Sequence, residues 1–182
     1  VAAARQPGLV LVLEDIHDPH NAAAILRTCD GLGLQDVYFI FDQEKPYNPK
    51  KIGKVTSSSA NKWLTFHILA PLQSGVNNAS RKEDVRKKKK YIIRENDSVR
   101  IVTGYSATEI CFRDLKKQKY QICATTLDKK SEDASQADLT AGKLALVVGN
   151  EHRGISSEAT HLADRLLYLP MAGFVESFNV SV

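Results

Sequence analysis

The sequence predicts an α/β protein with a mostly parallel sheet and helices on both faces. Apolar runs at residues 9–13 and 144–148 lack the alternation of half-exposed strands, so they are typical of strands buried on both faces. Segments with the spacing of amphipathic helices separate such runs, which favours parallel strands joined by helical crossovers. A chain of 182 residues is expected to form one domain.

The first strand is expected at residues 9–13. Asp18 then offers an N-cap and Pro19 suits the first helical position, so a helix is predicted over residues 20–31. The apolar positions of this helix and the glycines that end it are Ala24, Ile25, Leu26, Cys29, Gly31 and Gly33.

The same patterns continue along the chain. Strands are predicted at residues 36–41, 64–69, 120–126, 144–148 and 165–169. A helix is predicted at residues 107–117, and Ser156 is expected to cap another that runs to about residue 163.

One stretch, from about residue 73 to 105, breaks this rhythm and is predicted to be a basic insertion in the single domain 1–182. Seven of the ten residues from 81 to 90 are basic. The β-rich runs 91–93 and 99–102, joined through Asn96 and Asp97, resemble a hairpin.

Composition bounds the class of protein. Hydrophobic residues make up 43% and charged residues 25%, which excludes a disordered tail, a collagen-like rod and a disulfide-dense miniprotein. Lys and Arg outnumber Asp and Glu by 25 to 21, which mildly favours a polyanionic partner. No apolar run approaches the roughly 18–20 residues that span a bilayer, so no membrane association is expected.

The compartment and the chain ends give further expectations. Cys29, Cys111 and Cys123 lie in apolar stretches without metal-site spacing, so we expect buried, reduced thiols and a cytoplasmic location. No signal peptide opens the chain. The sequence begins at Val1 and stops at Val182 inside a segment that reads as ordered, so both native termini are expected to be missing.

Three polar clusters, at residues 17–27, 149–154 and 169–181, follow predicted strands. Ligands of open α/β sheets bind outside the carboxyl ends of strands, so the clusters could converge on one site. Familiar motifs are absent. Gly149 and Gly154 have P-loop spacing without the following lysine, no Gly-x-Gly-x-x-Gly follows the first strand, and no metal-ligand spacing occurs, so no metal is expected.

Each cluster, taken singly, also has an ordinary structural explanation. The glycines can serve turns, a carboxylate can stabilise a first helical turn, an arginine can be a solvated helix residue, and polar loop residues can brace a loop. The residues to which these explanations apply are Gly149, Gly154, Glu151, Arg27, Ser177 and Asn179.

Together and in this order, the clusters resemble the three signatures of the SpoU/TrmH family of SPOUT RNA ribose methyltransferases. The residues that carry the resemblance are Asn21, Ala24 and Arg27; Val148, Gly149, Glu151 and Gly154; and Leu169, Pro170, Met171, Gly173, Ser177, Phe178, Asn179, Val180 and Ser181. The similarity extends over residues 9–69 and 107–182 and leaves the basic insertion uncovered. Residues 18–21 and 25–30 are most similar to the tRNA D-loop guanosine enzymes.

The resemblance implies a C-terminal trefoil knot, a homodimer and S-adenosylmethionine as cofactor. It also implies methyl transfer to a ribose 2′-hydroxyl of RNA, in the first place of a tRNA D-loop guanosine. Ribosomal RNA enzymes share much of the pattern and remain an alternative, as does a catalytically silent RNA-binding protein of the same fold.

Site residues carry over by position. Thr125, Gly149, Leu169, Met171 and Phe178 should line the cofactor pocket. A side chain at position 149 would obstruct the approach of backbone to a ligand, which explains the glycine. The family usually has leucine where this chain has Phe178, so the apolar contact is expected to be larger here.

The expected catalytic set is Asn21, Arg27, Glu151, Ser177 and Asn179. Arg27 is the family's proposed catalytic residue. It could clamp a phosphate and stabilise an alkoxide, or act as a base within a carboxylate or phosphate network, and the sequence leaves both roles open. Glu151 is expected to fix Arg27 as an ion-pair partner, within one chain or across a dimer. Ser177 and Asn179 could bind the substrate ribose or brace the cofactor loop.

The lysine run Lys87, Lys88, Lys89 and Lys90 is predicted to contact RNA. Clustered lysines attract phosphates without reading sequence, which suits loose contact with an RNA backbone. A solvated loop and a localisation signal are the alternatives for this run.

Overall fold

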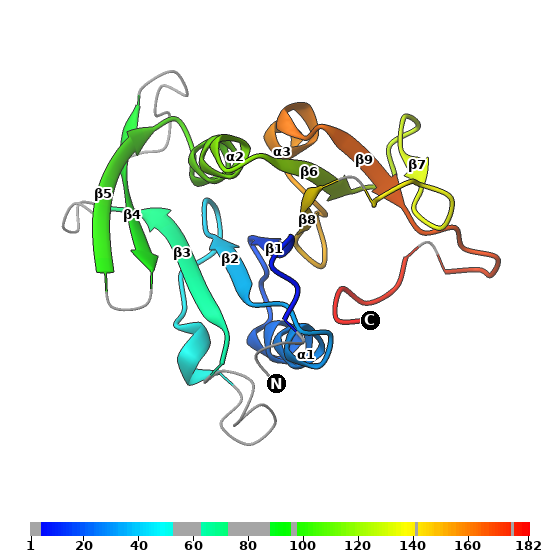
Figure 1. Ribbon diagram of the computed structural model, residues 1–182, viewed down its shortest axis with the longest axis horizontal. Coiled ribbons are helices and arrows are strands. Elements are labelled where there is room, and N and C mark those ends of the chain that lie inside the picture. The colour runs from blue at the N-terminus through cyan, green and yellow to red at the C-terminus, as the bar shows by residue number, and fades with distance from the viewer. Residues whose placement is uncertain (1–4, 53–62, 73–87, 96–97, 141, 176) are drawn as a thin grey trace.

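A computed structural model describes residues 5–52, 63–72, 88–95, 98–140, 142–175 and 177–182 (Figure 1). Its strands are β1 (Leu9–Glu14), β2 (Asp36–Ile40), β3 (Thr65–Pro71), β4 (Lys89–Glu95), β5 (Ser98–Gly104), β6 (Tyr120–Thr125), β7 (Glu132–Asp133), β8 (Lys143–Val148) and β9 (Arg165–Tyr168). The helices are α1 (Pro19–Gly31), α2 (Ala107–Lys117), α3 (Ser157–Leu162) and the short 3-10 helix η2 (Pro49–Lys51).

The described strands form one nine-stranded sheet in the order β5-β4-β3-β2-β1-β8-β6-β9-β7. The pairs β1–β2, β1–β8, β2–β3, β6–β8, β6–β9 and β7–β9 are parallel, whereas β3–β4 and β4–β5 are antiparallel. The α/β class with a mostly parallel sheet is therefore confirmed. β1 lies in the interior of the sheet, and its residues Val12 and Leu13 are fully buried.

Two hydrophobic clusters take alternate residues of β1. Leu11 and Leu13 belong to a cluster that includes the buried residues of α1, such as Leu26. Val10 and Val12 belong to a cluster that includes buried residues of α2 together with Ala159 of α3. Successive side chains of a strand point to opposite sides, so the unbroken apolar sequence of β1 supplies both clusters at once.

The helix ends follow the predicted capping residues. The Asp18 carboxylate accepts a hydrogen bond of 2.8 Å from the amide of His20, and Pro19 is the first residue of α1. Gly33 has φ of +78° just past the helix, which favours glycine. The Ser156 hydroxyl caps α3 by accepting from the amide of Ala159 at 3.0 Å.

The predicted hairpin exists, but it is a part of the main sheet. β4 pairs with β5 on one side and with β3 on the other. Tyr91 and Ile93 are 3% and 2% exposed and belong to the core cluster that contains α2. The prediction that residues 73–105 are an insertion is therefore wrong for residues 89–104, because their strands complete the sheet. Residues 73–87, with Lys87, and the expected turn at 96–97 lie outside the described residues.

The other elements agree with the sequence patterns to within one or two residues at each end. β7 and η2 were not expected, since two or three residues are too few to show a period. Cys29, Cys111 and Cys123 are buried free thiols, as predicted. Within the described residues, none of the helices is long and apolar enough to cross a membrane.

Candidate functional site at the carboxyl ends of the central strands

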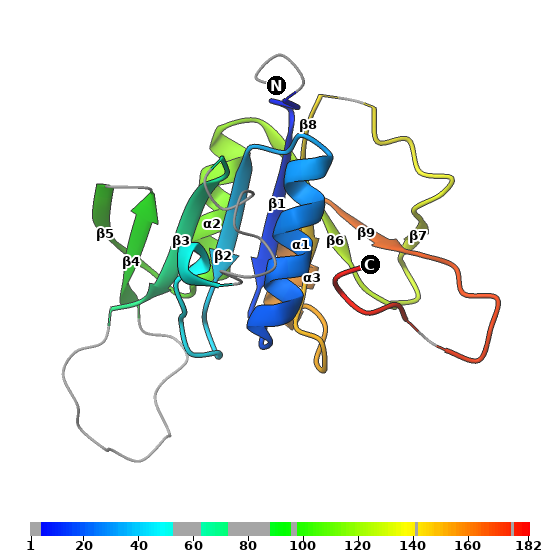
Figure 2. The ribbon, with the colours of Figure 1, turned by 90° about the horizontal axis from the view of Figure 1, so that it is seen from below.

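The segments after β1, β2 and β8 lie together at the edge of the sheet formed by the carboxyl ends of these strands (Figure 2). Glu151, just past β8, joins two of them. Its carboxylate accepts hydrogen bonds from the amides of His17 at 2.9 Å and Asp18 at 3.1 Å, and from the side chain of Asn21 at 2.9 Å. Residues 17–21 lead into α1, so the first and second predicted clusters meet at this carboxylate.

The electrostatics of Glu151 follow from these contacts. Burial alone would raise the pKa of Glu151, but the hydrogen bonds from Asn21 and from the amides of His17 and Asp18 lower it below its ordinary value. The carboxylate therefore stays ionised at neutral pH and anchors the start of α1. The expected pairing of Glu151 with Arg27 is not among these three contacts.

Arg27 lies on α1, two turns beyond the anchored segment. Its neighbours Ile25, Leu26 and Cys29 are buried, whereas Arg27 itself is exposed. Asn21 occupies the first turn of α1, six positions before Arg27. At 100° per residue, such a pair does not share a helix face. The helix thus directs Asn21 into the loop network and Arg27 outward.

The turn from β8 into α3 is closed by Asn150. Its side-chain nitrogen Nδ2 donates to the carbonyl of Asp15 at 2.8 Å. Its side-chain oxygen accepts from the backbone amides of His152 and Arg153 at 2.9 and 3.1 Å. Asn150 is 5% exposed, so these bonds satisfy a buried polar side chain. Sequence reasoning treated position 150 as unspecified within the second signature.

Gly149 is required for a reason that differs from the expected one. A Cβ at this position would lie 2.3 Å from the carbonyl carbon of Gly154 and 2.3 Å from the amide nitrogen of Ile155. The returning backbone of the turn therefore occupies the space beside Gly149. The expectation that glycine leaves room here for a ligand is therefore wrong at the position of the missing Cβ, which backbone atoms of Gly154 and Ile155 already fill. Gly154, with φ of +68°, completes the same turn.

A buried acidic network, which the sequence analysis missed, supports this edge. Glu14 is 2% exposed and accepts from the hydroxyls of Thr108 at 2.6 Å and Ser156 at 2.8 Å, and from the Ser156 amide at 2.8 Å. Thr108 belongs to α2 and Ser156 caps α3. One carboxylate at the end of β1 therefore fixes the first turns of two helices. The sequence signal for this network was Glu14 itself, an acidic residue directly after five apolar residues of β1.

Two more aspartates extend the network. Asp15, at φ of +52°, accepts from the amides of residues 42–44 at 2.9–3.2 Å. Asp42 in turn accepts from the amides of Ala107 and Thr108 at 2.9 and 3.1 Å. Burial raises the pKa of Asp42 to about 6, although these amides lower it. The loops after β1 and β2 and the start of α2 are thereby held together.

At the outer side of the edge, Glu44 bridges His17 and Arg153. Its carboxylate contacts Nδ1 of His17 at 2.9 Å and Nη2 of Arg153 at 2.7 Å. The hydrogen bond with Glu44 raises the pKa of His17, and the same bond lowers the pKa of Glu44. The rings of His17 and His152 lie 6.3 Å apart, so His17, His152 and Arg153 lie close together in the loops after β1 and β8.

The residues expected to bind the cofactor lie at the ends of neighbouring strands. Thr125 ends β6, Gly149 follows β8 and Leu169 follows β9, and β6 pairs with both of those strands. The Thr125 hydroxyl donates to the Val147 carbonyl at 3.1 Å. Leu169 is 55% exposed, so apolar surface is available for a planar ring at this edge.

The third cluster leaves β9 and returns toward α1. Val180 packs against the hydrophobic cluster that contains α1. Phe178 is 55% exposed, Met171 is half-buried, and Ser177 is exposed. The side-chain oxygen of Asn179 accepts from the amide and hydroxyl of Ser181 at 2.9 and 2.7 Å. Asn179 thus braces its own loop, which was one of its two expected roles.

The lysine run and possible metal sites complete the comparison with the sequence. Lys88, Lys89 and Lys90 are exposed around the start of β4, whereas Lys87 lies outside the described residues. In the part of the chain that the structure describes, no three His, Cys, Asp or Glu side chains are grouped to hold a metal ion.

Comparison with known proteins gives a consistent result. The SpoU rRNA Methylase family model matches residues 8–86 and 77–182, so the match also includes the stretch predicted as an uncovered insertion. The tRNA (guanosine(18)-2′-O)-methyltransferase of Thermus thermophilus is 30% identical over 178 residues, which are 98% of this chain and 71% of that protein. The enzyme of the same name from Escherichia coli is 28% identical over 180 residues, 99% of this chain and 61% of that protein.

A solved structure agrees with these sequence matches. The crystal structure of the A. aeolicus TrmH/SpoU tRNA modifying enzyme superposes with a TM-score of 0.69 at 27% identity. The superposition covers 98% of this chain and 70% of that one. Both family-model matches together extend over nearly the whole chain, and the predicted resemblance is confirmed. The chain belongs to the SpoU rRNA Methylase family.

Proposed function

We propose that this protein transfers a methyl group from S-adenosylmethionine to a ribose 2′-hydroxyl of RNA, and that its substrate is a guanosine in the D-loop of tRNA. Family membership and the names of the Thermus and E. coli relatives support the proposal. The observation that carries it is the binding of residues 17–21 by Glu151, because these hydrogen bonds join the first two signatures into one site.

The reaction sets clear demands on the protein. The sulfonium of the cofactor supplies an activated methyl group, so the protein must align the acceptor and manage one proton. A ribose hydroxyl is a weak nucleophile until its proton is removed or polarised. We assign Arg27 to the clamping of the target phosphate and the stabilisation of the developing alkoxide, because a guanidinium with a pKa above ~12 is a poor base.

Four more residues of the site have supporting roles in this proposal. Asn21 and Glu151 orient the segment that leads into α1, which fixes the position of that helix and of Arg27 on it. Ser177 and Asn179 meet the substrate ribose or order the loop beside it, and the Asn179–Ser181 bonds favour loop ordering for Asn179. Alignment of reacting groups can lower a barrier by roughly 7–11 kcal/mol in favourable cases.

The strand ends of β6, β8 and β9 suit the cofactor. Thr125, Gly149 and Leu169 place backbone groups on three adjacent strands beside exposed apolar surface, and adenine binding needs both. Met171 and Phe178 are assigned to the same pocket from their place in the third signature. Phe178 offers a larger apolar face than the leucine usual in the family.

Three finer features belong to this proposal. Helices cover both faces of the sheet, as the two clusters along β1 suggest, and the C-terminal segment forms the knot of the family. The protein acts as a homodimer in the cytoplasm. Lysines 87–90 contact the RNA backbone. Light scattering at micromolar concentration should give twice the mass of the chain, and a mass of one chain would contradict the dimer.

The decisive experiment is transfer of labelled methyl from S-adenosylmethionine to total tRNA and, separately, to total ribosomal RNA. Nucleoside mapping should then find 2′-O-methylguanosine in the D-loop of tRNA. Label in ribosomal RNA alone would support the ribosomal alternative. Binding of RNA and cofactor without any transfer would support a catalytically silent RNA-binding protein.

A further inference from the structure

The β4–β5 hairpin brings basic residues to the same sheet edge as the candidate site. Glu14 of β1 is level with Ile40, Ile40 with Leu69, and Leu69 with Ile93 of β4. β4 runs antiparallel to β3, so its first residues extend past this level toward the carboxyl ends of the central strands. Lys89 and Lys90 therefore lie at the height of the loops that carry the site.

The distance between the lysines of β4 and the loops after β1 and β8, measured across the sheet, follows from the strand order. β4 is three strands from β1 and four from β8. Neighbouring strands lie about 4.8 Å apart, so the lysines stand roughly 14–19 Å from the site loops along the edge. An RNA strand advances by several ångströms per phosphate, and a few nucleotides on one side of the target ribose would span this distance.

Tyr105 directly follows Gly104, which pairs with Lys89, and the backbone of Tyr105 is held by two hydrogen bonds. Its amide donates to Glu109 at 3.0 Å, and its carbonyl accepts from the buried hydroxyl of Tyr91 at 2.9 Å. Tyr105 is 50% exposed, and the ammonium of Lys88 lies 5.5 Å from the centroid of its ring. An exposed aromatic ring beside lysines is the arrangement on which proteins stack nucleic-acid bases while they hold the backbone.

The segment that follows Tyr105 is hydrogen-bonded to the site loops. Two residues after Tyr105, the amide of Ala107 donates to Asp42 in the loop after β2. Thr108 then donates to Glu14 at the end of β1. The backbone of Tyr105, which follows the strand paired with β4, and the loops after β1 and β2 are therefore all held at the start of α2.

We propose that Lys88, Lys89, Lys90 and Tyr105 form a second RNA-contact patch, the hairpin patch, which holds the substrate's backbone and stacks one base a few nucleotides away from the methylated ribose. The proposal rests on the proposed function. It adds that the enzyme selects RNA long enough to reach from the site to the hairpin patch, and that an RNA confined to the target nucleotide and its nearest neighbours binds without this contribution.

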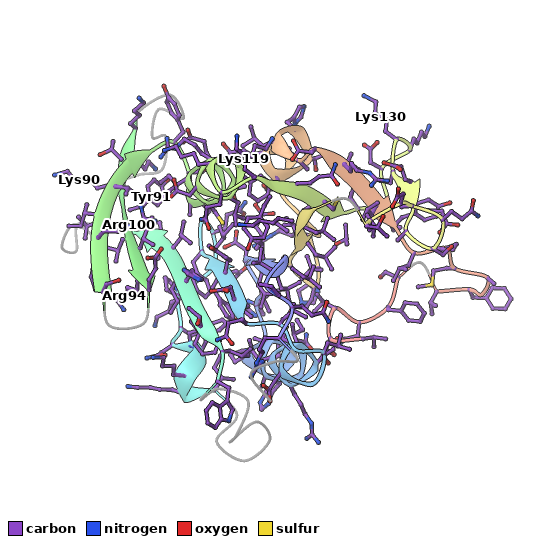
Figure 3. All side chains as sticks on the ribbon, in the orientation of Figure 1. Lys90, Tyr91, Arg94, Arg100, Lys119 and Lys130 are labelled. Carbon is purple, nitrogen blue, oxygen red and sulfur yellow. The ribbon has the colours of Figure 1, made fainter. Side chains whose placement is uncertain are left out.

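The chain offers a matched control in Arg94. Lys90 and Arg94 are both exposed, lie on the same side of β4 and carry the same charge, but they project from opposite ends of the strand (Figure 3). Arg94 is level with Ile68, about 13 Å back along the strand from Lys90. Among the described residues, neither side chain forms an ion pair. Only Lys90 is at the edge that carries the site.

The test is fluorescence-anisotropy binding of a tRNA D-arm and of a pentanucleotide centred on the target guanosine, over a series of salt concentrations. Combined replacement of Lys88, Lys89 and Lys90 by serine should weaken D-arm binding about tenfold or more and flatten its salt slope by about two to three. Tyr105→Ala should weaken it by roughly fivefold or more, and Tyr105→Phe should restore it. Arg94→Ser and all pentanucleotide affinities should stay within twofold of the wild-type values.

Two results would overturn the hairpin patch. One is a D-arm affinity and salt slope of the triple-lysine variant equal to those of the wild type. The other is an equal loss from Lys90→Ser and Arg94→Ser, which would indicate unspecific attraction to the whole hairpin. Failure of the proposed function is distinguishable, because it would appear as wild-type protein that binds RNA but transfers no methyl group.

Discussion

Replacement of Glu151 tests whether the junction of the first two signatures organises the site. A hydrogen bond to a charged acceptor contributes about 1.5–3 kcal/mol, toward the lower end for a half-buried group such as Glu151. Glu151→Ala removes three such bonds, which act on one short segment and do not add fully, so we expect a loss of about 2–4 kcal/mol in unfolding free energy. Glu151→Gln keeps one oxygen but turns a donor toward the His17 amide, and should lose about 1–2 kcal/mol.

Urea unfolding followed by circular dichroism measures the loss of unfolding free energy. For a slope of roughly 2 kcal/mol per molar urea, Glu151→Ala should lower the midpoint by about 1–2 M. Methyl transfer, assayed under conditions in which the variant stays folded, measures the effect on turnover. We expect turnover to fall at least tenfold, because residues 17–21 fix the start of the helix that carries Arg27.

Glu132→Ala is the matched control. The Glu132 carboxylate accepts two hydrogen bonds, from Nε and Nη2 of Arg165 at 2.9 and 2.7 Å, whereas Glu151 accepts three. Glu132 lies on β7, the last strand at one side of the sheet. Its removal should leave turnover at the wild-type value. The reasoning is refuted if Glu151→Ala unfolds at the wild-type midpoint and turns over normally, or if Glu132→Ala reduces turnover as much.

Three further changes have defined outcomes. Arg27→Ala should cut turnover by orders of magnitude with little change in cofactor affinity, and Arg27→Lys should not rescue it, because a point charge lacks the planar fork; titration with S-adenosylmethionine and single-turnover kinetics check this. Gly149→Ala should lose about 3 kcal/mol or more in thermal unfolding, because its Cβ would lie 2.3 Å from backbone atoms. The native pKa of Asp42, about 6, exceeds its ordinary 3.8, so stability should fall by about 2–3 kcal/mol as pH rises from 4 to 7, and Asp42→Asn should flatten this decline.

The sequence predicted the elements that have strong local signals. The apolar run at β1, the Asp18-Pro19 start of α1 and the Ser156 cap of α3 depend on local chemistry, and all appear in the structure. The site segments were also found, because three signatures in order are specific even where one alone is weak. Convergence of the first two at Glu151 followed from the rule for strand ends in parallel sheets.

Interactions between distant residues explain what the sequence left undetermined. Glu14, Asp15 and Asp42 read as ordinary acids at strand ends. Only the fold brings to them the amides of the loop after β2 and the amides and hydroxyls at the starts of α2 and α3. The hairpin was mistaken for an appendage because its antiparallel pairing with β3 has no local signature. The reason for Gly149 was misjudged, since the neighbour that excludes a side chain is five residues later in the same turn.

The position of β1 has a consequence for the synthesis of the chain. Among the described strands, β1 is made before the others, and it lies between β2, which follows soon after, and β8, at residues 143–148. At translation rates of 5–20 residues per second, roughly 5–20 s pass between the emergence of β2 and that of β8. Throughout this interval one side of the Leu-Val-Leu-Val-Leu strand has no partner, and an unpaired apolar edge is a template for association with other chains. Ribosome-bound intermediates that stop before residue 143 should therefore be the most aggregation-prone species in the life of this protein.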